Sequence, residues 1–208
     1  MEYKTEQEKF WSSQEWGDAY IERNSYDRVK NNVQFFSKIL ERTSNIKSII
    51  EFGANIGLNL IALKQLLPDA KYSALEINQN ACKELKKLNF IDNIYNQSFF
   101  DYETSNAKDF VFTKVVLIHI HPEYLNVVYE KLYDSSNKYI LIAEYYNPTP
   151  VEINYRGYEG KLFKRDFAGD MIDRYNDLEL IDYGFAYRRD NNFHQDDITW
   201  FLLKKNSL

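Results

Sequence analysis

The residues best suited to chemistry form a short acidic and glycine-containing pattern. Glu51 ends an apolar run, Gly53, Asn55 and Gly57 follow at every second position, and Glu76 ends the next apolar run. Glycine allows a tight turn and close approach of a ligand, and the helix after such a turn presents unpaired N–H groups. An acidic residue placed as Glu76 is typically an acceptor for both ribose hydroxyls of a nucleoside. The pattern predicts a nucleoside-binding strand–loop–helix; the alternative for Glu76 is a solvent-exposed carboxylate at a strand end.

The spacing within the turn separates classes of nucleotide site. A dinucleotide-binding turn has glycines at relative positions 0, 2 and 5, whereas here Leu58 occupies the last of these places. No Lys-Ser or Lys-Thr pair follows, which excludes a phosphate-binding P-loop. An acidic residue two positions before the first glycine, with a 0/2/4 spacing, resembles motif I of the class I S-adenosylmethionine-dependent methyltransferases. Asn55 departs from the commonest form of that motif, but Asn tolerates a left-handed backbone better than most residues.

Further candidates follow the third and fourth predicted strands. Ser98 would meet the exocyclic amine of an adenine ring and Phe99 would wall the base, although Phe99 fits a core position equally well. His119 lies at the carboxyl edge, where open α/β sheets bind ligands, and would act as a general base. The alternative is a structural histidine that is hydrogen-bonded to the backbone. His119 and His121 also suggest a metal site, but a third ligand such as His194 would have to come from far away, so we predict no metal.

The end of the fifth strand and the segment after it supply the remaining candidates. Glu144 and Tyr145 are alternative general bases, and Tyr146 faces the same edge as a substrate contact. Arg156 and Arg165 come from a segment without clear periodicity. Because arginine pairs bidentately with carboxylates, these two predict a carboxylated or otherwise anionic substrate. The alternative is a set of surface salt bridges within a loop.

Strands that alternate with helices must position these residues. The predicted strands of the core are 48–52, 71–76, 93–95, 109–113 and 138–144, and the predicted helices are 27–42, 57–67, 80–88 and 122–133. This alternation specifies a parallel, doubly wound sheet. Two further strands, 178–188 and 197–204, leave no room for a crossover helix and must pair as an antiparallel hairpin. We therefore predict a Rossmann-like class I methyltransferase fold, with a seven-stranded, mostly parallel sheet, a C-terminal antiparallel hairpin and helices on both faces.

We expect a single domain with four parts. Residues 1–45 form an N-terminal helical cap, in which aromatic side chains either close a lid over the cofactor or simply dock the helices. Residues 46–144 form the cofactor-binding core, and 171–208 form the closing hairpin. Residues 145–170 read as a long substrate-side loop, and loops of this length are usually functional or disordered.

Composition limits the classes of partner and compartment. The chain has 208 residues, a net charge of -5 and one cysteine. An acidic balance argues against a nucleic-acid partner, and a lone cysteine fits a reducing cytoplasm. We expect no signal peptide and no membrane span, because no stretch has the required apolar length.

With these residues assembled, the chain resembles the pseudaminic acid biosynthesis-associated methylases, a class I methyltransferase family, nearly from end to end. The resembling segments are GDAYIERN (17–24), EFGANIGLNL (51–60), FTKVVLIHI (112–120), YRG (155–157), LFKRDFAG (162–169) and DDITWFLL (196–203). Motif I is shared by very many methyltransferases, whereas the last two segments are much narrower. Asn55 matches the family's own form of motif I.

The resemblance implies S-adenosyl-L-methionine as cofactor and methyl transfer to a small acidic sugar, of nonulosonic (pseudaminic) type, or to its precursor in surface glycan biosynthesis. Within the cap, Tyr20, Arg23 and Asn24 are the expected cofactor contacts. One alternative function is a non-catalytic module that binds S-adenosylmethionine as a regulator or partner. A second alternative is an NAD-binding oxidoreductase, which Leu58 and the terminal hairpin disfavour.

Overall fold

A computed structural model describes residues 3–22 and 24–206 of the chain. The helices are α1 (Glu6–Ser12), the π-helical η1 (Gln14–Asp18), α2 (Ala19–Glu22), α3 (Arg28–Leu40), α4 (Leu58–Leu66), α5 (Gln79–Leu85), the 3₁₀ turns η2 (Leu117–His119) and η3 (Pro122–Tyr124), α6 (Leu125–Asp134) and α7 (Phe167–Arg174). The strands are β1 (Ser48–Phe52), β2 (Lys71–Glu76), β3 (Ile91–Asn96), β4 (Lys108–Lys114), β5 (Ser136–Glu144), β6 (Val151–Tyr155), β7 (Tyr158–Lys164), β8 (Leu178–Ala186) and β9 (Ile198–Lys205).

Seven strands form one sheet in the order β3-β2-β1-β4-β5-β9-β8. The first five are parallel, β9 is antiparallel to β5, and β8 is antiparallel to β9. This arrangement confirms the predicted fold class, including the closing hairpin. The order reverses between β1 and β4, and such a reversal is where open α/β sheets bind their ligands.

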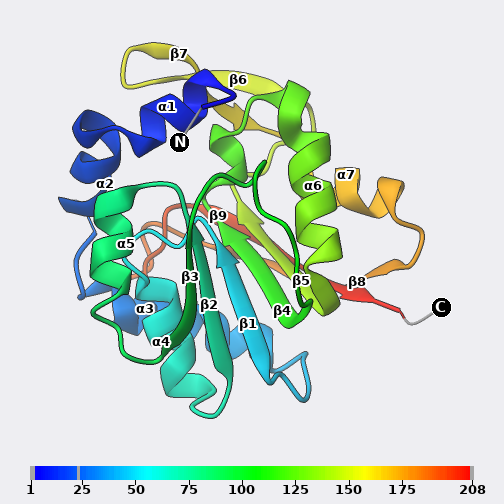
Figure 1. The fold of residues 1–208 in the computed structure, drawn as a ribbon. Helices are drawn as coiled ribbons and strands as arrows, with labels where there is room; N and C mark the ends of the chain where they lie inside the picture. Colours follow the sequence, from blue (N-terminus) through cyan, green and yellow to red (C-terminus); the bar gives the residue numbers. More distant parts are fainter. Residues whose placement is uncertain (1–2, 23, 207–208) are drawn as a thin grey trace.

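Alternating apolar residues cover both faces of the sheet. Ile49 packs with the layer of α3, α4 and α5, and the next residue, Ile50, packs with α6 and α7. The two layers appear on opposite sides of the sheet in Figure 1. Because both faces are buried, the central strands can be almost continuously apolar. A polar group at the end of such a strand is therefore unusual and points to the site.

The segment that we predicted as an irregular loop, 145–170, is mostly regular. It contains the two-stranded hairpin β6–β7 and the start of α7. The hairpin turns at Arg156 and Gly157, which have φ angles of 54° and 90°. Its first strand is largely exposed, so it lacks the inward apolar pattern by which a strand is recognised in a sequence. The prediction of a loop was therefore wrong: a hairpin with an exposed strand does not show the alternating pattern of a buried one.

The hairpin and α1 lie together over the end of the sheet to which the parallel strands point (Figure 1). Gln7 Nε2 donates to the carbonyl of Gly160 at 2.9 Å, and Lys161 Nζ lies 3.3 Å from Glu6 Oε2. The rings of Trp16 and Tyr158 meet edge to face with centroids 5.0 Å apart. The two segments thus form a roof over the carboxyl ends of the strands.

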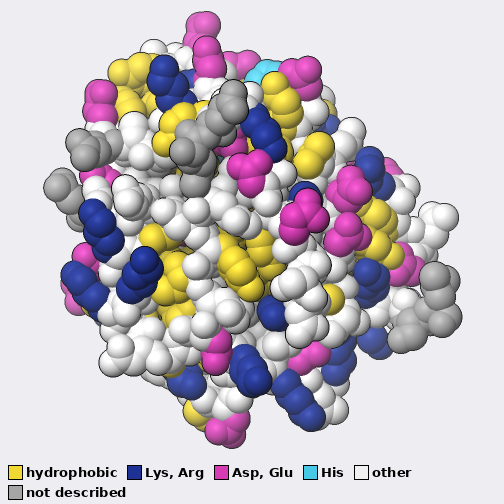
Figure 2. Space-filling model, in the orientation of Figure 1, with side chains coloured by type: hydrophobic (Ala, Val, Ile, Leu, Met, Phe, Trp, Pro, Cys, Tyr) yellow, Lys and Arg dark blue, Asp and Glu magenta, His cyan; other side chains and the backbone are white. Residues whose placement is uncertain are grey.

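Figure 2 shows one face of the molecule, on which Lys and Arg side chains alternate with Asp and Glu side chains. This face has no continuous basic area of the kind that a nucleic acid requires. Among the helices of residues 3–22 and 24–206, none has the length and apolar character needed to cross a membrane.

Candidate functional site

The turn after β1 depends on residues with a left-handed backbone. Gly53, Asn55 and Gly57 have φ angles of 80°, 46° and 82°. A Cβ atom on Gly53 would lie 2.6 Å from Cγ2 of Val116, so this glycine also provides space for the turn that follows β4. The prediction of a tight turn that requires glycine is confirmed at both positions, and Asn55 adopts the left-handed conformation expected of it.

Glu76 holds this turn from the end of β2. Its Oε2 accepts from the backbone N–H of Asn55 at 2.7 Å, and its Oε1 accepts from the backbone N–H of Asn78 at 2.7 Å. Burial raises the pKa of Glu76, whose side chain is only 8% exposed, while these backbone donors lower it. The alternative of a solvent-exposed carboxylate is therefore wrong. A carboxylate has about four acceptor sites, so the backbone donors of Asn55, Asn78 and Ile77 leave it able to accept from a ligand as well.

Glu51 lies beneath the turn. Its Oε1 accepts from Asn59 Nδ2 at 2.6 Å, and its Oε2 has no hydrogen-bond partner among the described residues. Burial raises the pKa of Glu51 to about 8. The side chain does not line either of the cavities described below, so its predicted contact with a cofactor stays a prediction.

The larger cavity lies between the turn after β1, the turn after β4 and the roof. It encloses about 860 Å³ of empty space, including its open mouth. Five predicted site residues line it apart from the glycine turn, and these are Tyr20, Glu76, Ser98, Phe99 and His119. Ser98 Oγ accepts from the backbone N–H of Phe100 at 3.1 Å, which shapes the loop after β3.

A hydrogen bond within the protein holds one ring nitrogen of His119, Nδ1. Its Nδ1 lies 2.7 Å from the carbonyl oxygen of Lys161 in β7, so Nδ1 carries the proton and donates it. Burial lowers the pKa of His119 to about 4, which keeps the ring neutral near pH 7. The rings of Trp11 and Tyr155 lie 4.4 and 5.2 Å away between centroids. The hydrogen bond to the backbone that the structural alternative requires is present. It leaves Nε2 with a lone pair, and the role of His119 as a general base stays a prediction.

Glu144 organises the turn that carries His119. Its carboxylate accepts from the backbone N–H groups of Val116 at 3.0 Å, Leu117 at 3.1 Å and Ile118 at 3.4 Å. Burial raises the pKa of Glu144 to about 7. The side chain lines neither cavity, and its oxygens already accept several hydrogen bonds. Its contacts give no support to the predicted role as a general base.

The same turn contains a strained residue. Val115 has a φ of 59°, which is a costly conformation for a β-branched side chain. It lines both cavities. Strain of this kind persists only when the surroundings enforce it, and here Glu144 fixes the residues that follow.

The tyrosines after β5 line neither cavity, although Tyr145 lies near Tyr20, Arg28 and Asp196 of the second one. Burial raises the pKa of Tyr145 well above its usual range, which opposes a role as a base. The ring of Tyr146 packs at 5.7 Å from that of Phe201. The predicted roles of Tyr145 as a base and of Tyr146 as a substrate contact stay predictions.

The two predicted substrate arginines are also outside the cavities. Arg156 lies at the hairpin turn with its guanidinium 5.8 Å from the ring centroid of Tyr155. Arg165 Nε lies 2.8 Å from Asp170 Oδ2, in a geometry that forms an ion pair but not an aligned hydrogen bond. For Arg165 the alternative of a local salt bridge describes the structure.

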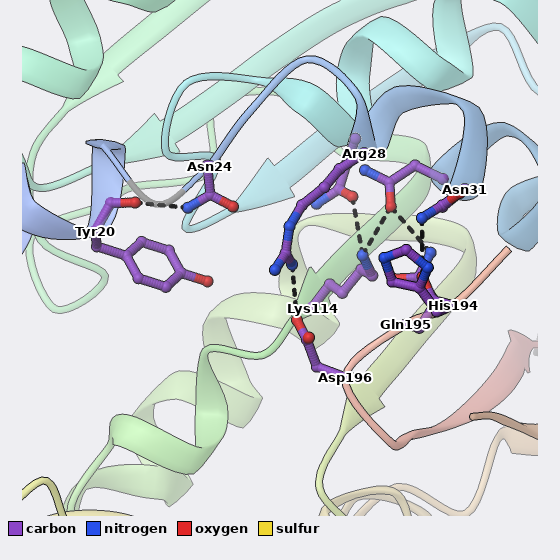
Figure 3. Close-up of polar contacts among 10 residues, drawn as sticks. Tyr20, Asn24, Arg28, Asn31, Lys114, His194, Gln195 and Asp196 are labelled. Atoms are coloured by element: carbon purple, nitrogen blue, oxygen red, sulfur yellow. Dashed lines mark hydrogen bonds and ion pairs between the residues drawn. The ribbon is translucent and has the colours of Figure 1, made fainter. Parts of the chain in front are cut away.

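A second cavity of about 560 Å³ adjoins the first. Residues that line both are Tyr20, Gly53, Asn55, Val115 and Val116. The second cavity is polar because Arg28, Lys114 and Asp196 reach it from α3, from β4 and from the segment before β9 (Figure 3).

The polar groups of the second cavity form a connected set. Arg28 Nη1 donates to Asp196 Oδ2 at 2.8 Å. Lys114 Nζ donates to the amide oxygens of Asn32 and Asn59 at 3.1 and 3.3 Å. Burial lowers the pKa of Lys114 to about 8. A buried ammonium whose hydrogen-bond partners are neutral amides is suited to an anionic ligand group.

The cap contributes only part of what was predicted. Tyr20 lines both cavities, and burial raises its pKa to about 12. Asn24 lines the second cavity and donates to the Tyr20 carbonyl at 2.7 Å. Arg23 lies outside the described residues. Sequence reasoning missed Arg28 and Lys114; the signal for Lys114 was a cation at the end of an otherwise apolar strand.

The described residues contain no group of three or more His, Cys, Asp or Glu side chains that could hold a metal ion. His121 Nδ1 accepts from the backbone N–H of Glu123 at 3.4 Å. The carbonyl of His194 accepts from Asn31, and Asp196 is paired with Arg28.

Comparison with known proteins gives matches in structure alone. No protein-family model matches the chain, and no curated protein matches it in sequence. The plantazolicin methyltransferase BpumL in complex with S-adenosylhomocysteine is 14% identical with a TM-score of 0.67, over 97% of this chain and 94% of that chain. A S-adenosylmethionine-dependent methyltransferase of Leishmania major is 13% identical with a TM-score of 0.69, over 95% and 81%.

A third similar structure is the magnesium protoporphyrin IX methyltransferase ChlM from Synechocystis PCC 6803 with bound S-adenosylmethionine. It is 12% identical, with a TM-score of 0.66 over 99% of this chain and all of that chain. At these identities the likeness concerns the fold: the chain has the Rossmann-like class I methyltransferase fold.

Proposed function

We propose that the protein is a S-adenosylmethionine-dependent methyltransferase. The observation that carries the proposal is the pairing of Glu76 with the glycine turn at the reversal of strand order, beside a cavity large enough for a nucleoside. Two solved structures that match this chain over nearly their whole length contain S-adenosylhomocysteine or S-adenosylmethionine. This match supports the choice of cofactor.

In this proposal the adenosine moiety occupies the larger cavity. Glu76 accepts from the ribose hydroxyls with its remaining lone pairs, and Ser98 and Phe99 border the base. Asn55 and Gly53 bring backbone close to the ligand. These roles are the ones predicted from the sequence, and the supporting observation is that all five residues line one cavity.

The amino-acid end of the cofactor would extend into the second cavity. Arg28 and Lys114 provide positive charge for a carboxylate, and Asp196 provides negative charge for an ammonium group. Tyr20 and Asn24 border the passage from the cap side. Because Gly53 and Val116 line both cavities, a single ligand would extend from the first cavity into the second.

His119 would serve as the general base for a hydroxyl or ammonium acceptor. When bound, the cofactor supplies an electrophilic methyl group on a positively charged sulfur. Nε2 of His119 is unprotonated near pH 7 and would take the proton of the acceptor. Because the positive charge of the sulfonium is lost as the imidazolium forms, the net charge of the buried cavity is unchanged. Since a pKa of about 4 makes His119 a weak base, the proton would leave the acceptor together with the methyl transfer and not before it.

The acceptor that we propose is a small acidic sugar of nonulosonic (pseudaminic) type, or its precursor in surface glycan biosynthesis. The support is the family resemblance, above all in segments 162–169 and 196–203. Tyr155 belongs to another resembling segment and lies beside His119, with Arg156 next to it. A carboxylate on the acceptor would then meet Arg156 at the hairpin turn, outside the cavity.

Thermal unfolding in the presence of candidate cofactors tests the proposed function. S-adenosylhomocysteine should raise the Tm in a concentration-dependent manner, because a ligand that binds only the native state stabilises it. NAD at the same concentrations should leave the Tm unchanged. A rise with NAD alone would overturn the proposal in favour of an oxidoreductase. Binding without any methylated product from acidic sugars would remove the proposed acceptor.

A further inference from the structure

Helix α1 lies across the larger cavity and is anchored at both ends to loops that border it. Near its start, Lys4 Nζ lies 2.5 Å from Asp101 Oδ1, in the loop that follows Ser98. Near its end, the Trp11 carbonyl accepts from Asn78 Nδ2 at 3.5 Å. The helix therefore runs from the loop that borders the proposed base to the residue beside Glu76.

One carboxylate of this helix is half satisfied. Glu8 is 7% exposed and lines the larger cavity. Its Oε2 accepts from the backbone N–H groups of Lys4 at 2.5 Å and Thr5 at 2.9 Å, which closes a capping box. Its Oε1 is buried without a hydrogen-bond partner among residues 3–22 and 24–206. The capping box thus occupies Oε2 and leaves Oε1 as the oxygen without a partner.

A second unsatisfied group lies beside it. Nε1 of Trp11 is also buried and has no hydrogen-bond partner in the described chain. Trp11 follows Glu8 by three positions, so the two side chains are neighbours on one face of the helix. Both line the larger cavity. Burial of an unsatisfied acceptor and an unsatisfied donor costs free energy, and a ligand that supplies their partners recovers it.

We propose that Glu8 and Trp11 form a base-reading site in the roof. Glu8 Oε1 accepts a hydrogen bond from the 6-amino group of the adenine, and the indole N–H of Trp11 donates to a ring nitrogen beside that amine. The inference rests on the proposed function and adds a specificity element to it. A 6-aminopurine presents this donor next to an acceptor, whereas a 6-oxopurine presents an acceptor to Glu8.

The position of α1 favours the base over the other candidate groups. Glu8 lies in the first turn of the helix, close to the anchor at Asp101, which belongs to the loop that borders the base. The ribose hydroxyls are already served by Glu76 in this account.

Isothermal titration of two nucleosides against Glu8→Gln tests this site. The backbone N–H groups of Lys4 and Thr5 require an oxygen, so the amide should keep its oxygen there and turn its NH₂ toward the cavity. The wild type should bind S-adenosylhomocysteine at least tenfold more tightly than S-inosylhomocysteine. Glu8→Gln should reduce that ratio by tenfold or more, because it replaces an acceptor by a donor.

Glu6→Gln is the matched control on the same helix. Glu6 pairs with Lys161, and its side chain is 89% exposed, so this variant should keep the ratio of the wild type. Trp11→Phe removes the indole donor and should weaken S-adenosylhomocysteine binding severalfold. Circular dichroism and the Tm report whether each variant is folded.

The remaining outcomes contradict the inference in different ways. If Glu8→Gln weakens both nucleosides equally, Glu8 does not read the base. If it weakens neither, its free oxygen faces no part of the cofactor. If the folded wild type binds neither nucleoside, the proposed function fails and this inference fails with it.

Discussion

The protonation state of His119 is set by its surroundings in the folded protein. Burial lowers its pKa from 6.5 to about 4. Between these two values the unfolded chain binds a proton that the folded chain does not. The free energy of unfolding therefore falls as the pH decreases from about 6.5 to about 4. Above pH 6.5 both states are neutral at this residue and the contribution is constant.

Replacement of His119 by Asn should remove this pH dependence. Asn keeps a donor for the Lys161 carbonyl but does not titrate. Between pH 7 and pH 5 the wild type should lose about 2 kcal/mol more unfolding free energy than His119→Asn does, as measured by urea unfolding. The raised pKa values of Glu51 and Glu144 act in the opposite direction, but both carboxyls are present in both proteins. Equal losses in the two proteins would contradict a buried neutral imidazole.

Lys114 should contribute to binding through the amino-acid end of the cofactor. Lys114→Met removes a buried ammonium whose hydrogen-bond partners are the amide oxygens of Asn32 and Asn59. We expect S-adenosylhomocysteine affinity to fall by about tenfold or more, corresponding to about 1.4 kcal/mol. Affinity for methylthioadenosine, which lacks the carboxylate, should be unchanged.

The stability of Lys114→Met provides a second measurement. Lys114→Met removes the cost of burying a charge, but it also leaves the amide oxygens of Asn32 and Asn59 with one donor fewer, so the Tm should change by only a few degrees. Equal losses of affinity for both nucleosides, or a large fall in Tm, would show that Lys114 supports the fold and not the carboxylate.

At the scale of elements, the turn after β1 and the turn after β4 constrain one another. Gly53→Ala places a Cβ 2.6 Å from Val116 and also imposes a φ of 80° on a residue with a side chain. We expect a loss of roughly 2 to 5 kcal/mol in unfolding free energy, from the left-handed backbone and the overpacking together. Cofactor binding should be lost as well, because the displaced turn carries Val115.

Gly157→Ala is the control for backbone strain alone. Its φ is 90°, and no heavy atom lies within 4 Å of the position of its Cβ. Urea unfolding should give a loss of about 1 to 2 kcal/mol, with cofactor binding unchanged. Similar losses in both variants would mean that Val116 moves aside easily and that the two turns are not coupled.

The sequence allowed much of the core to be predicted, because its periodicity is strong. Strands β1 and β2 begin and end at the predicted residues, and Asn78 caps α5 through its side chain. Asp27 stands at the start of α3 as predicted, but its side chain makes no capping hydrogen bond. Local patterns identify a helix start; they do not determine which polar atom turns toward it.

Contacts between distant segments could not be predicted in this way. Glu144 and the backbone of Val116 are 28 positions apart, and their meeting depends on the register of β4 and β5. Lys161 reaches His119 only because the segment around it is a hairpin. The sequence analysis did not single out Glu8, whose capping box and unpaired Oε1 are known only from the folded structure.

At the scale of the whole molecule, the site is assembled from segments that are far apart in the chain. The sheet brings together the ends of β1, β2 and β4, while α1 and the β6–β7 hairpin close over them (Figure 1). One cavity would hold a nucleoside and the adjoining cavity carries the charged side chains. A ligand that is apolar and aromatic at one end and zwitterionic at the other matches this division.

The central claim is that Glu76 and the glycine turn bind the cofactor. Isothermal titration with S-adenosylhomocysteine tests it most directly, in the wild type and in the variants Glu76→Ala and Glu84→Ala. Glu84 is a carboxylate of α5 whose hydrogen bonds go to Lys87, so its loss should leave binding unchanged. The account predicts binding to the wild type that Glu76→Ala weakens by about tenfold or more, or about 1.4 kcal/mol. Absence of binding to the folded wild type, or equal affinity in Glu76→Ala, would contradict it.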